Sequence, residues 1–144
     1  MFIGEYLHTL DDKKRVSLPA KFRKEVGRMV VVTRGLDQCL FLFPAKAWKE
    51  IAAKLASLPF GQADTRGISR FLLAGAVEGE VDSAGRILIP DFLKEFASLK
   101  GRVVLTGVSE RIEIWDEGVW SEYKAKIEGS AEAMAQTLGD VGIL

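Results

Sequence analysis

Two short segments of the chain combine an aspartate, a bend and an arginine at the same spacing. Asp11 precedes Arg15 by four residues, and Asp82 precedes Arg86 by four. An aspartate at the start of a turn can accept backbone N–H bonds and tighten the bend, and Gly85 supplies a positive φ at little cost. Arginine is planar, bidentate and permanently charged, so it can grip a phosphate or the O6/N7 edge of guanine. The chemistry of the two segments is therefore compatible with nucleic-acid binding.

The same pattern has a purely structural interpretation, in which each aspartate pairs with its own arginine and only fixes a hairpin. The charge around the first turn bears on this choice, because residues 11–28 hold only three acids. Their basic side chains are Lys13, Lys14, Arg15, Lys21, Arg23, Lys24 and Arg28. A solvated helix face accounts for some of these lysines, but their concentration favours a DNA-facing patch. We expect the main contacts from Arg15 and Arg86, with weaker phosphate contacts from Lys13, Lys14, Lys21 and Arg23.

Both motifs belong to an internal repeat, which is the first feature to seek in a sequence. Residues 11–19 align with residues 82–90 at an offset of 71, with Asp, Arg and Pro identical. A second block begins where Val31-Val32 aligns with Val103-Val104, at an offset of 72. It pairs Gly35 with Gly107 and Trp48 with Trp120. One small insertion between the blocks reconciles the two offsets.

Each copy predicts the same series of elements. A short strand enters the turn, and a second strand leaves it and ends at a proline, which suits the first turn of a helix. The expected short helices cover 19–26 and 90–97. A hairpin follows in each copy: strands 29–33 and 39–43 with a turn at Gly35, then strands 103–106 and 111–115 with a turn at Gly107. A longer helix with a tryptophan on its apolar face closes each unit.

These boundaries predict two units that cannot fold independently. We expect the copies at 1–57 and 75–128, a linker at 58–74, and a tail at 129–144 that either frays or forms a short helix around 131–138. A copy of roughly 70 residues with exposed strand edges buries too little surface on its own. The copies should therefore pair about a pseudo-two-fold axis and share one mainly β core with short helices.

The composition suits a soluble protein of the cytosol. Hydrophobic residues make up 48% of the chain and charged residues 28%, enough for a core and a solvated surface. The single cysteine excludes an internal disulfide framework. The start lacks the features of a secretory leader, and no apolar stretch approaches the roughly 20 residues that span a bilayer.

The net charge of zero conceals an asymmetry between the two halves. Residues 1–72 hold 13 Lys/Arg and 7 Asp/Glu, whereas residues 73–144 hold 7 and 13. Opposite halves indicate either a nucleic-acid face or association through complementary charge. A chance distribution of exposed charges is the plainer interpretation.

An enzyme would need reactive groups that the sequence does not bring together. His8 is the only histidine and has no serine or cysteine motif beside it, while Cys39 lies in an apolar strand and is expected in the core. Zinc-ligand spacings and phosphate-cradling glycine loops are lacking. We therefore expect no catalytic activity, metal or cofactor.

The two motifs and their surroundings resemble the signatures of the MraZ family. The matching segments are Phe2-x-Gly4, Asp11-x-Lys13-x-Arg15, Leu18-Pro19-x-Lys21-Phe22-Arg23, Asp82-x-x-Gly85-Arg86-Ile87-x-Ile89-Pro90, Phe43-Pro44 leading to Trp48, and Ile112-Glu113-Ile114-Trp115 leading to Trp120. They cover nearly the whole chain in the family's order. One departure is Lys14, which stands where the family usually has glycine, so that turn either differs in shape or gains a phosphate contact.

The resemblance implies both a fold and a function. It implies two AbrB-like units in a β-barrel-like core, and a cytoplasmic, nucleoid-associated regulator of the bacterial division and cell-wall gene cluster. Such a regulator binds short direct repeats in a promoter as a ring-like homo-oligomer, with the arginines of the turns on DNA. The alternative is an AbrB-like antitoxin or protein-assembly module. An antitoxin should carry a long disordered tail, which the short, partly apolar segment 129–144 disfavours.

Overall fold

A computed structural model describes residues 1–143 of the chain. Strands and helices alternate along these residues in two similar series. The elements are β1 (Phe2–Thr9), β2 (Arg15–Ser17), α1 (Ala20–Val26), β3 (Met29–Arg34), β4 (Leu40–Pro44), α2 (Ala45–Ala56), α3 (Ala63–Ala74), β5 (Val77–Glu80), β6 (Arg86–Leu88), α4 (Asp91–Phe96), β7 (Arg102–Ser109), β8 (Arg111–Asp116), α5 (Glu117–Gly129) and α6 (Ala131–Asp140). Three helices begin directly after a proline: Pro19 precedes α1 and Pro90 precedes α4, as expected, and Pro44, the last residue of β4, precedes α2.

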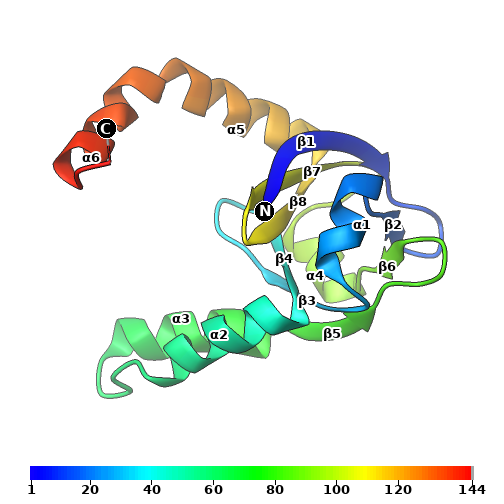
Figure 1. Ribbon diagram of the computed structural model, residues 1–144, viewed down its shortest axis with the longest axis horizontal. Coiled ribbons are helices and arrows are strands. Elements are labelled where there is room, and N and C mark those ends of the chain that lie inside the picture. The colour runs from blue at the N-terminus through cyan, green and yellow to red at the C-terminus, as the bar shows by residue number, and fades with distance from the viewer. Residues whose placement is uncertain (144) are drawn as a thin grey trace.

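The main antiparallel sheet mixes the two copies of the repeat (Figure 1). Its strand order is β1-β7-β8-β4-β3-β5. The first strand of each copy pairs with the third strand of the other copy, β1 with β7 and β5 with β3. The two fourth strands, β4 and β8, pair with each other in the middle. The copies are therefore interleaved rather than set side by side.

A pseudo-two-fold axis relates the copies, as the repeat predicts. In the two-stranded ribbon β2–β6, Val16 lies opposite its own counterpart Ile87. The backbone bonds around this ribbon are reciprocal: Leu18 N–H donates to Gly85 O at 2.8 Å, and Ile89 N–H donates to Lys14 O at 2.8 Å. Because equivalent residues pair with each other, the fold has an approximate internal two-fold.

One apolar core serves both copies, which confirms that neither has a core of its own. The buried side chains of this core come from both halves of the chain, among them Val16, Leu18, Val26, Leu40, Leu42, Ile87, Ile89, Leu93, Leu105, Ile112 and Ile114. Tryptophans of the long helices α2 and α5 pack on aromatic residues of the main sheet. The ring centroids of Trp48 and Phe43 are 5.6 Å apart, and those of Trp120 and Trp115 are 5.1 Å apart. The tryptophans are therefore packing anchors.

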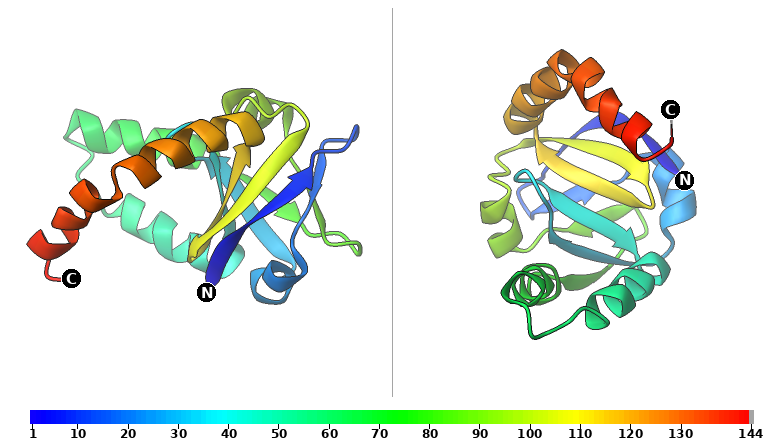
Figure 2. Two further views of the ribbon diagram at one scale, coloured as in Figure 1. Left: turned by 90° about the horizontal axis from the view of Figure 1, so that it is seen from above. Right: turned by 90° about the vertical axis from the view of Figure 1, so that its left-hand side faces the viewer.

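The expected barrel-like closure is not confirmed, because the sheet is open. β1 and β5 lie at its two edges and do not pair with each other, and β2 and β6 form a separate ribbon. The ribbon and the short helices α1 and α4 lie against the curved sheet instead (Figure 2). A ribbon that crosses the sheet can bury Val16 and Ile87 without joining the hydrogen-bonded ladder, so closure of the sheet is not needed to complete the core.

The alignment of the third strands by sequence is wrong by one residue. Val30 lies opposite Pro44, and Val103 lies opposite Asp116. Pro44 and Asp116 are equivalent, so the counterpart of Val103 is Val30 and not Val31. All the valines of β3 are buried, and a run buried on both faces carries no alternation that could set the register.

Gly107 accordingly lies within β7 and not at the hairpin turn. It pairs with Gly4 of β1, and a Cβ at Gly107 would overlap the backbone of Ile3. The turn comes later, where Ser109 adopts a φ of +62°. This glycine permits a close approach of two strands.

Two pairs of helices extend from the sheet, here called the α2–α3 arm and the α5–α6 arm (Figures 1 and 2). The segment expected as a linker, 58–74, is largely the helix α3, whose last turn is fixed to β3. Thr33 Oγ1 donates to Leu72 O at 2.6 Å, and Arg34 Nε donates to Phe71 O at 2.9 Å. In the tail, the helical alternative is the one observed, as α6. Within residues 1–143, no helix has the length and apolar character to cross a membrane.

Candidate nucleic-acid interface

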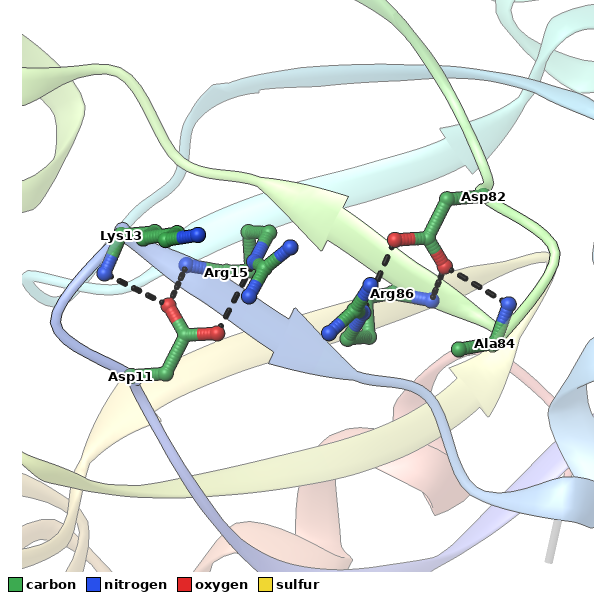
Figure 3. Close-up of polar contacts among 6 residues, drawn as sticks. All are labelled: Asp11, Lys13, Arg15, Asp82, Ala84 and Arg86. Carbon is green, nitrogen blue, oxygen red and sulfur yellow. Dashed lines mark hydrogen bonds and ion pairs between the residues drawn. The ribbon is translucent and has the colours of Figure 1, made fainter.

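Asp11 holds the first turn together through its carboxylate (Figure 3). Oδ1 accepts the backbone N–H of Lys13 at 2.9 Å and that of Arg15 at 2.8 Å. Oδ2 accepts the Nε–H of the Arg15 side chain at 2.9 Å. The backbone N–H of Asp11 donates to Arg15 O at 3.0 Å, which closes the turn.

Asp82 makes the same three bonds in the second turn (Figure 3). Its Oδ1 accepts the N–H groups of Ala84 at 3.0 Å and Arg86 at 2.8 Å, and its Oδ2 accepts Arg86 Nε–H at 2.8 Å. Each distance lies within 0.1 Å of its counterpart in the first turn. The contact that the structural interpretation of the motif predicts is therefore present in both copies.

The electrostatics of the turns favour charged aspartates. The pKa values of Asp11 and Asp82 are lowered, first by the backbone N–H of the arginine that ends each turn and then by that arginine's side chain. Hydrogen bonds to a carboxylate stabilise its ionised form. Both carboxylates are thus anionic at neutral pH and orient a guanidinium that keeps its charge.

The bracing contact leaves part of each guanidinium for a ligand. Only Nε of Arg15 and of Arg86 is used by its aspartate, and within residues 1–143 no other hydrogen bond engages the two side chains. Their exposed fractions are 28% and 34%. Because Nη1 and Nη2 are the fork that binds phosphate or guanine, bracing and binding are compatible at the same residue.

The ribbon β2–β6 presents both arginines on one face. Arg15 lies opposite Leu88 and Arg86 lies opposite Ser17, so the two arginines are diagonal neighbours. Side chains alternate along a strand, and the intervening Val16 and Ile87 are buried in the core. Both guanidinium groups therefore point away from the core (Figure 3).

Lys14 keeps the shape of the glycine turn. It adopts a φ of +62°, where Gly85 has +78°, and both residues donate to the carbonyl of the first turn residue, at 3.0 Å and 2.9 Å. A different turn shape, one of the two expected outcomes of this departure, is therefore wrong. The ammonium of Lys14 pairs with Asp91 of α4, and this contact lowers the pKa of Asp91.

Arg23 lies across the turn of the other copy. Its Nε donates to Leu18 O at 2.8 Å, and a Cβ at Gly85 would overlap its guanidinium. Gly85 is therefore favoured by its φ and required by this close contact. Burial lowers the pKa of His8, and the charge of the Arg23 guanidinium lowers it further.

The remaining expected contacts, Lys13 and Lys21, are exposed. Lys13 lies in the first turn and Lys21 in the first turn of α1, and both are exposed. The structure thus brings Arg15 and Arg86 together, places Arg23 against the second turn and Lys14 against α4, and leaves Lys13 and Lys21 in solvent.

Sequence reasoning missed three residues of this face. Ser17 and Leu88 lie on the ribbon beside the arginines, and Asp91 pairs with Lys14. The alternation of side chains in β2 and β6 could have identified the first two. No local signal could have identified the third, because the contact depends on pairing between copies.

Reactive chemistry is disfavoured elsewhere in the described chain. Cys39 is buried, and burial raises the pKa of its thiol far above the ordinary range. A buried neutral thiol behaves as a small apolar side chain. Among residues 1–143, no group of three or more His, Cys, Asp and Glu is placed to hold a metal ion.

Comparison with known proteins places the chain in a family. The family model described as "MraZ protein, putative antitoxin-like" matches residues 1–71 and 72–141. A relative from Moorella thermoacetica, named transcriptional regulator MraZ, is 49% identical over 143 residues, covering 99% of this chain and all of the relative. One from Thermoanaerobacter sp. strain X514, with the same name, is 50% identical over the same shares. These matches span two copies and nearly the full length, and they are to transcriptional regulators rather than enzymes. The chain belongs to the MraZ family.

Proposed function

We propose that the protein is a sequence-specific DNA-binding transcriptional regulator of the bacterial division and cell-wall gene cluster. In this proposal it binds short direct repeats in the promoter as a homo-oligomer, and it works in the cytoplasm at the nucleoid. The observation that carries the proposal is the ribbon face, on which two braced arginines point outward from a pseudo-two-fold axis. The names of the relatives support the same reading.

The ribbon has the shape and chemistry to enter a major groove. That groove admits a two-stranded β-ribbon, and arginine bidentate to guanine is its commonest specific contact. Asp11 and Asp82 fix the side chains of Arg15 and Arg86 before DNA arrives. Preorganised side chains lose little conformational freedom on binding, so each arginine can contribute its full interaction with a base.

Basic residues around the ribbon supply attraction that is independent of sequence. Lys13 and Lys21 are exposed and unhindered for phosphate contact. Arg23 reaches the second turn, and Lys14 would have to leave Asp91 to contact DNA. Within this set we expect Lys14 to contribute least, because its charge is already partly neutralised.

The helical arms suggest how several copies assemble. The α2–α3 arm holds five Lys/Arg and two Asp/Glu, whereas the α5–α6 arm holds two and five. Phe60, at the tip of the α2–α3 arm, is 86% exposed. A head-to-tail contact between the basic arm of one copy and the acidic arm of the next closes into a ring when the rotation allows.

A ring would turn weak single contacts into strong binding. One ribbon offers few contacts, so its own affinity should be modest. Once one ribbon is bound, later contacts become intramolecular, and avidity can rise by roughly 10² to 10⁴. Operators with several repeats should therefore bind far better than operators with one.

The test is Arg15→Ala and Arg86→Ala, separately and together, with binding to the division-cluster promoter measured by gel-shift titration. Each base-reading arginine should be worth about 1–3 kcal/mol of binding free energy. The matched control is Arg102→Ala, which removes an exposed arginine paired with Glu117 outside the ribbon. Circular dichroism and the mass of the oligomer are checked first. A folded, assembled double variant that binds as tightly as wild type would reduce the arginines to turn braces.

The complementary arms also favour a second candidate, an antitoxin-like or protein-assembly module whose main ligand is protein. This candidate predicts that the oligomer forms normally while the protein shows no preference for any DNA sequence. Light scattering combined with selection from random duplexes separates the two. A monomeric mass at moderate salt would contradict the homo-oligomer that both candidate functions include.

A further inference from the structure

Leu88 is an exposed apolar residue in the middle of the proposed DNA face. It ends β6 and its exposed fraction is 60%. It lies directly opposite Arg15 in the ribbon, on the same face as both arginines. The Leu88 side chain does not contribute to the core, whereas its neighbours Ile87 and Ile89 are buried in it.

The pseudo-two-fold makes Leu88 distinctive. Its counterpart in the first copy is Ser17, which lies opposite Arg86. The substitution continues into the helices, where Lys21 of α1 corresponds to Phe92 of α4, itself 47% exposed. The side chains beside the two turns therefore differ although the backbone is the same: Leu88 lies beside Arg15 of the first turn, whereas Ser17 and Arg23 lie beside the second.

We propose that Leu88 is a specificity-determining residue that contacts the C5-methyl group of a thymine. The thymine would lie next to the base pair that Arg15 reads, in the major groove. The thymine methyl is the one apolar group that the major groove displays, and apolar side chains recognise it. This inference rests on the proposed DNA binding through the ribbon.

The spacing of the ribbon fits this assignment. Residues directly opposite each other in an antiparallel pair have Cβ atoms about 4.5–5.5 Å apart. Successive base pairs rise about 3.4 Å along the duplex. Arg15 and Leu88 therefore reach the same or the adjacent base pair, which places a guanine and a thymine methyl side by side in the recognised sequence.

The consequence is that the two halves of the DNA-binding face are not equivalent. Ser17 can form a hydrogen bond beside Arg86 but gives no comparable apolar contact, so the two halves of the ribbon prefer different base pairs. A protein with two identical halves would favour a palindrome. The difference between Leu88 and Ser17 instead favours an oriented site, as in repeats that all run the same way.

The test compares thymine with uracil, which differ only in the methyl group. The probe is the duplex that the full-length wild-type protein enriches from a random-sequence library, with each thymine replaced in turn by uracil. We expect one thymine per repeat at which wild type loses affinity about three- to fivefold, the value of one buried methyl. Leu88→Ser, which copies Ser17, should bind thymine and uracil duplexes alike at that position.

Two controls separate this inference from the proposed function. Leu36→Ser removes an exposed leucine outside the ribbon and should keep the methyl effect. Arg15→Ala should weaken binding to both duplexes. If the arginine variants lose binding but no methyl matters, Leu88 reads no thymine while the DNA-binding proposal stands. If wild type enriches no sequence, both fail. A change in oligomer mass for Leu88→Ser, without a change in the methyl effect, would assign the residue to a protein contact and overturn the inference.

Discussion

The turn at 11–15 and the turn at 82–86 contain the same carboxylate hydrogen bonds, yet different side chains lie against them. Over the second turn, Arg23 packs on a glycine so closely that a Cβ would not fit. In the first turn, the same backbone position is Lys14, whose side chain pairs with Asp91. The backbone is thus preserved where the flanking chemistry has diverged.

This difference shows which features the turns require. Both need the aspartate and the arginine, because these residues fix the geometry in each copy. Glycine is required only where a neighbouring side chain occupies the space of a Cβ. A lysine at positive φ costs about 1–2 kcal/mol, which the rest of the fold can absorb. The divergence also places the apolar Leu88 beside the first turn and the polar Ser17 beside the second.

Exchanging the residues at positive φ should have the largest effect on stability. Gly85→Lys combines a strained φ with an overlap that displaces Arg23 from Leu18 O, so it should cost about 2–3 kcal/mol. Lys14→Gly should change stability by less than about 1 kcal/mol, because relief of strain offsets greater freedom in the unfolded chain. Denaturant unfolding at one fixed protomer concentration measures both. Equal effects would mean that the turns are not distinguished by their neighbours.

The contact between Arg23 and Gly85 should appear as energetic coupling. Gly85→Ala should be milder in an Arg23→Ala background, with a coupling free energy of about 1 kcal/mol. Lys94, the counterpart of Arg23 in α4, supplies the control, since Lys94→Ala and Gly85→Ala should be additive. Additivity in both cycles would show that the φ of Gly85 alone explains its need for glycine.

The carboxylates of Asp11 and Asp82 should make the free energy of unfolding depend on pH in the same way in both turns. Their pKa values are lowered from 3.8 in the folded protein, so they stabilise the fold above that pH. The stabilisation is lost as the pH falls through the lowered values. An Asp11→Asn and Asp82→Asn double variant should be less stable than wild type at pH 7, and the difference should shrink in acid. Asp12→Asn, which lies outside the hydrogen bonds of the turn, is the control. A difference that does not change with pH would rule out charge as the cause.

The smallest expected effects concern the salt dependence of DNA binding. Lys21→Ala should flatten the slope of log affinity against log salt by about 0.9, the value of one phosphate contact. Phe92→Lys, the reverse change in the other copy, should steepen it by a similar amount. Lys14→Ala should change it less, because Lys14 already pairs with Asp91. Equal slopes for all three variants would place phosphates away from this face.

The spacing of apolar residues and the positions of proline and glycine predicted most of the helices and strands. The predictions that failed have physical reasons. Prolines and the Asp-x-x-x-Arg motif marked the strand ends and turns closely, because each acts on its own backbone. The register of β3 was wrong, since three successive buried valines look alike. Gly61 and Gly67 suggested a linker where α3 forms, because the contacts of its last turn with Thr33 and Arg34 depend on tertiary structure.

The candidate site was predictable in its residues but not in its arrangement. The repeat identified Arg15 and Arg86, and the pseudo-two-fold implied related positions for them. Their diagonal placement on one ribbon follows from pairing between β2 and β6, which no local pattern specifies. For the same reason, the contact of Arg23 with Gly85 and that of Lys14 with Asp91 could not be read from either copy alone.

The interleaved sheet also affects the timing of folding during synthesis. Phe2 pairs with Ser109, and the whole of β1 waits for β7. When the first copy leaves the ribosome, β3 can already pair with β4, but β1 still lacks β7 and the other edge of β3 still lacks β5. The ladder can be completed only after most of the chain has been made. Native contacts of such high sequence separation form slowly because a long loop must close first. During that interval the unpaired edges of β1 and β3 could pair with the same strands of another nascent chain. The interleaved arrangement that unites the two copies therefore also exposes an incomplete chain to strand exchange with other chains.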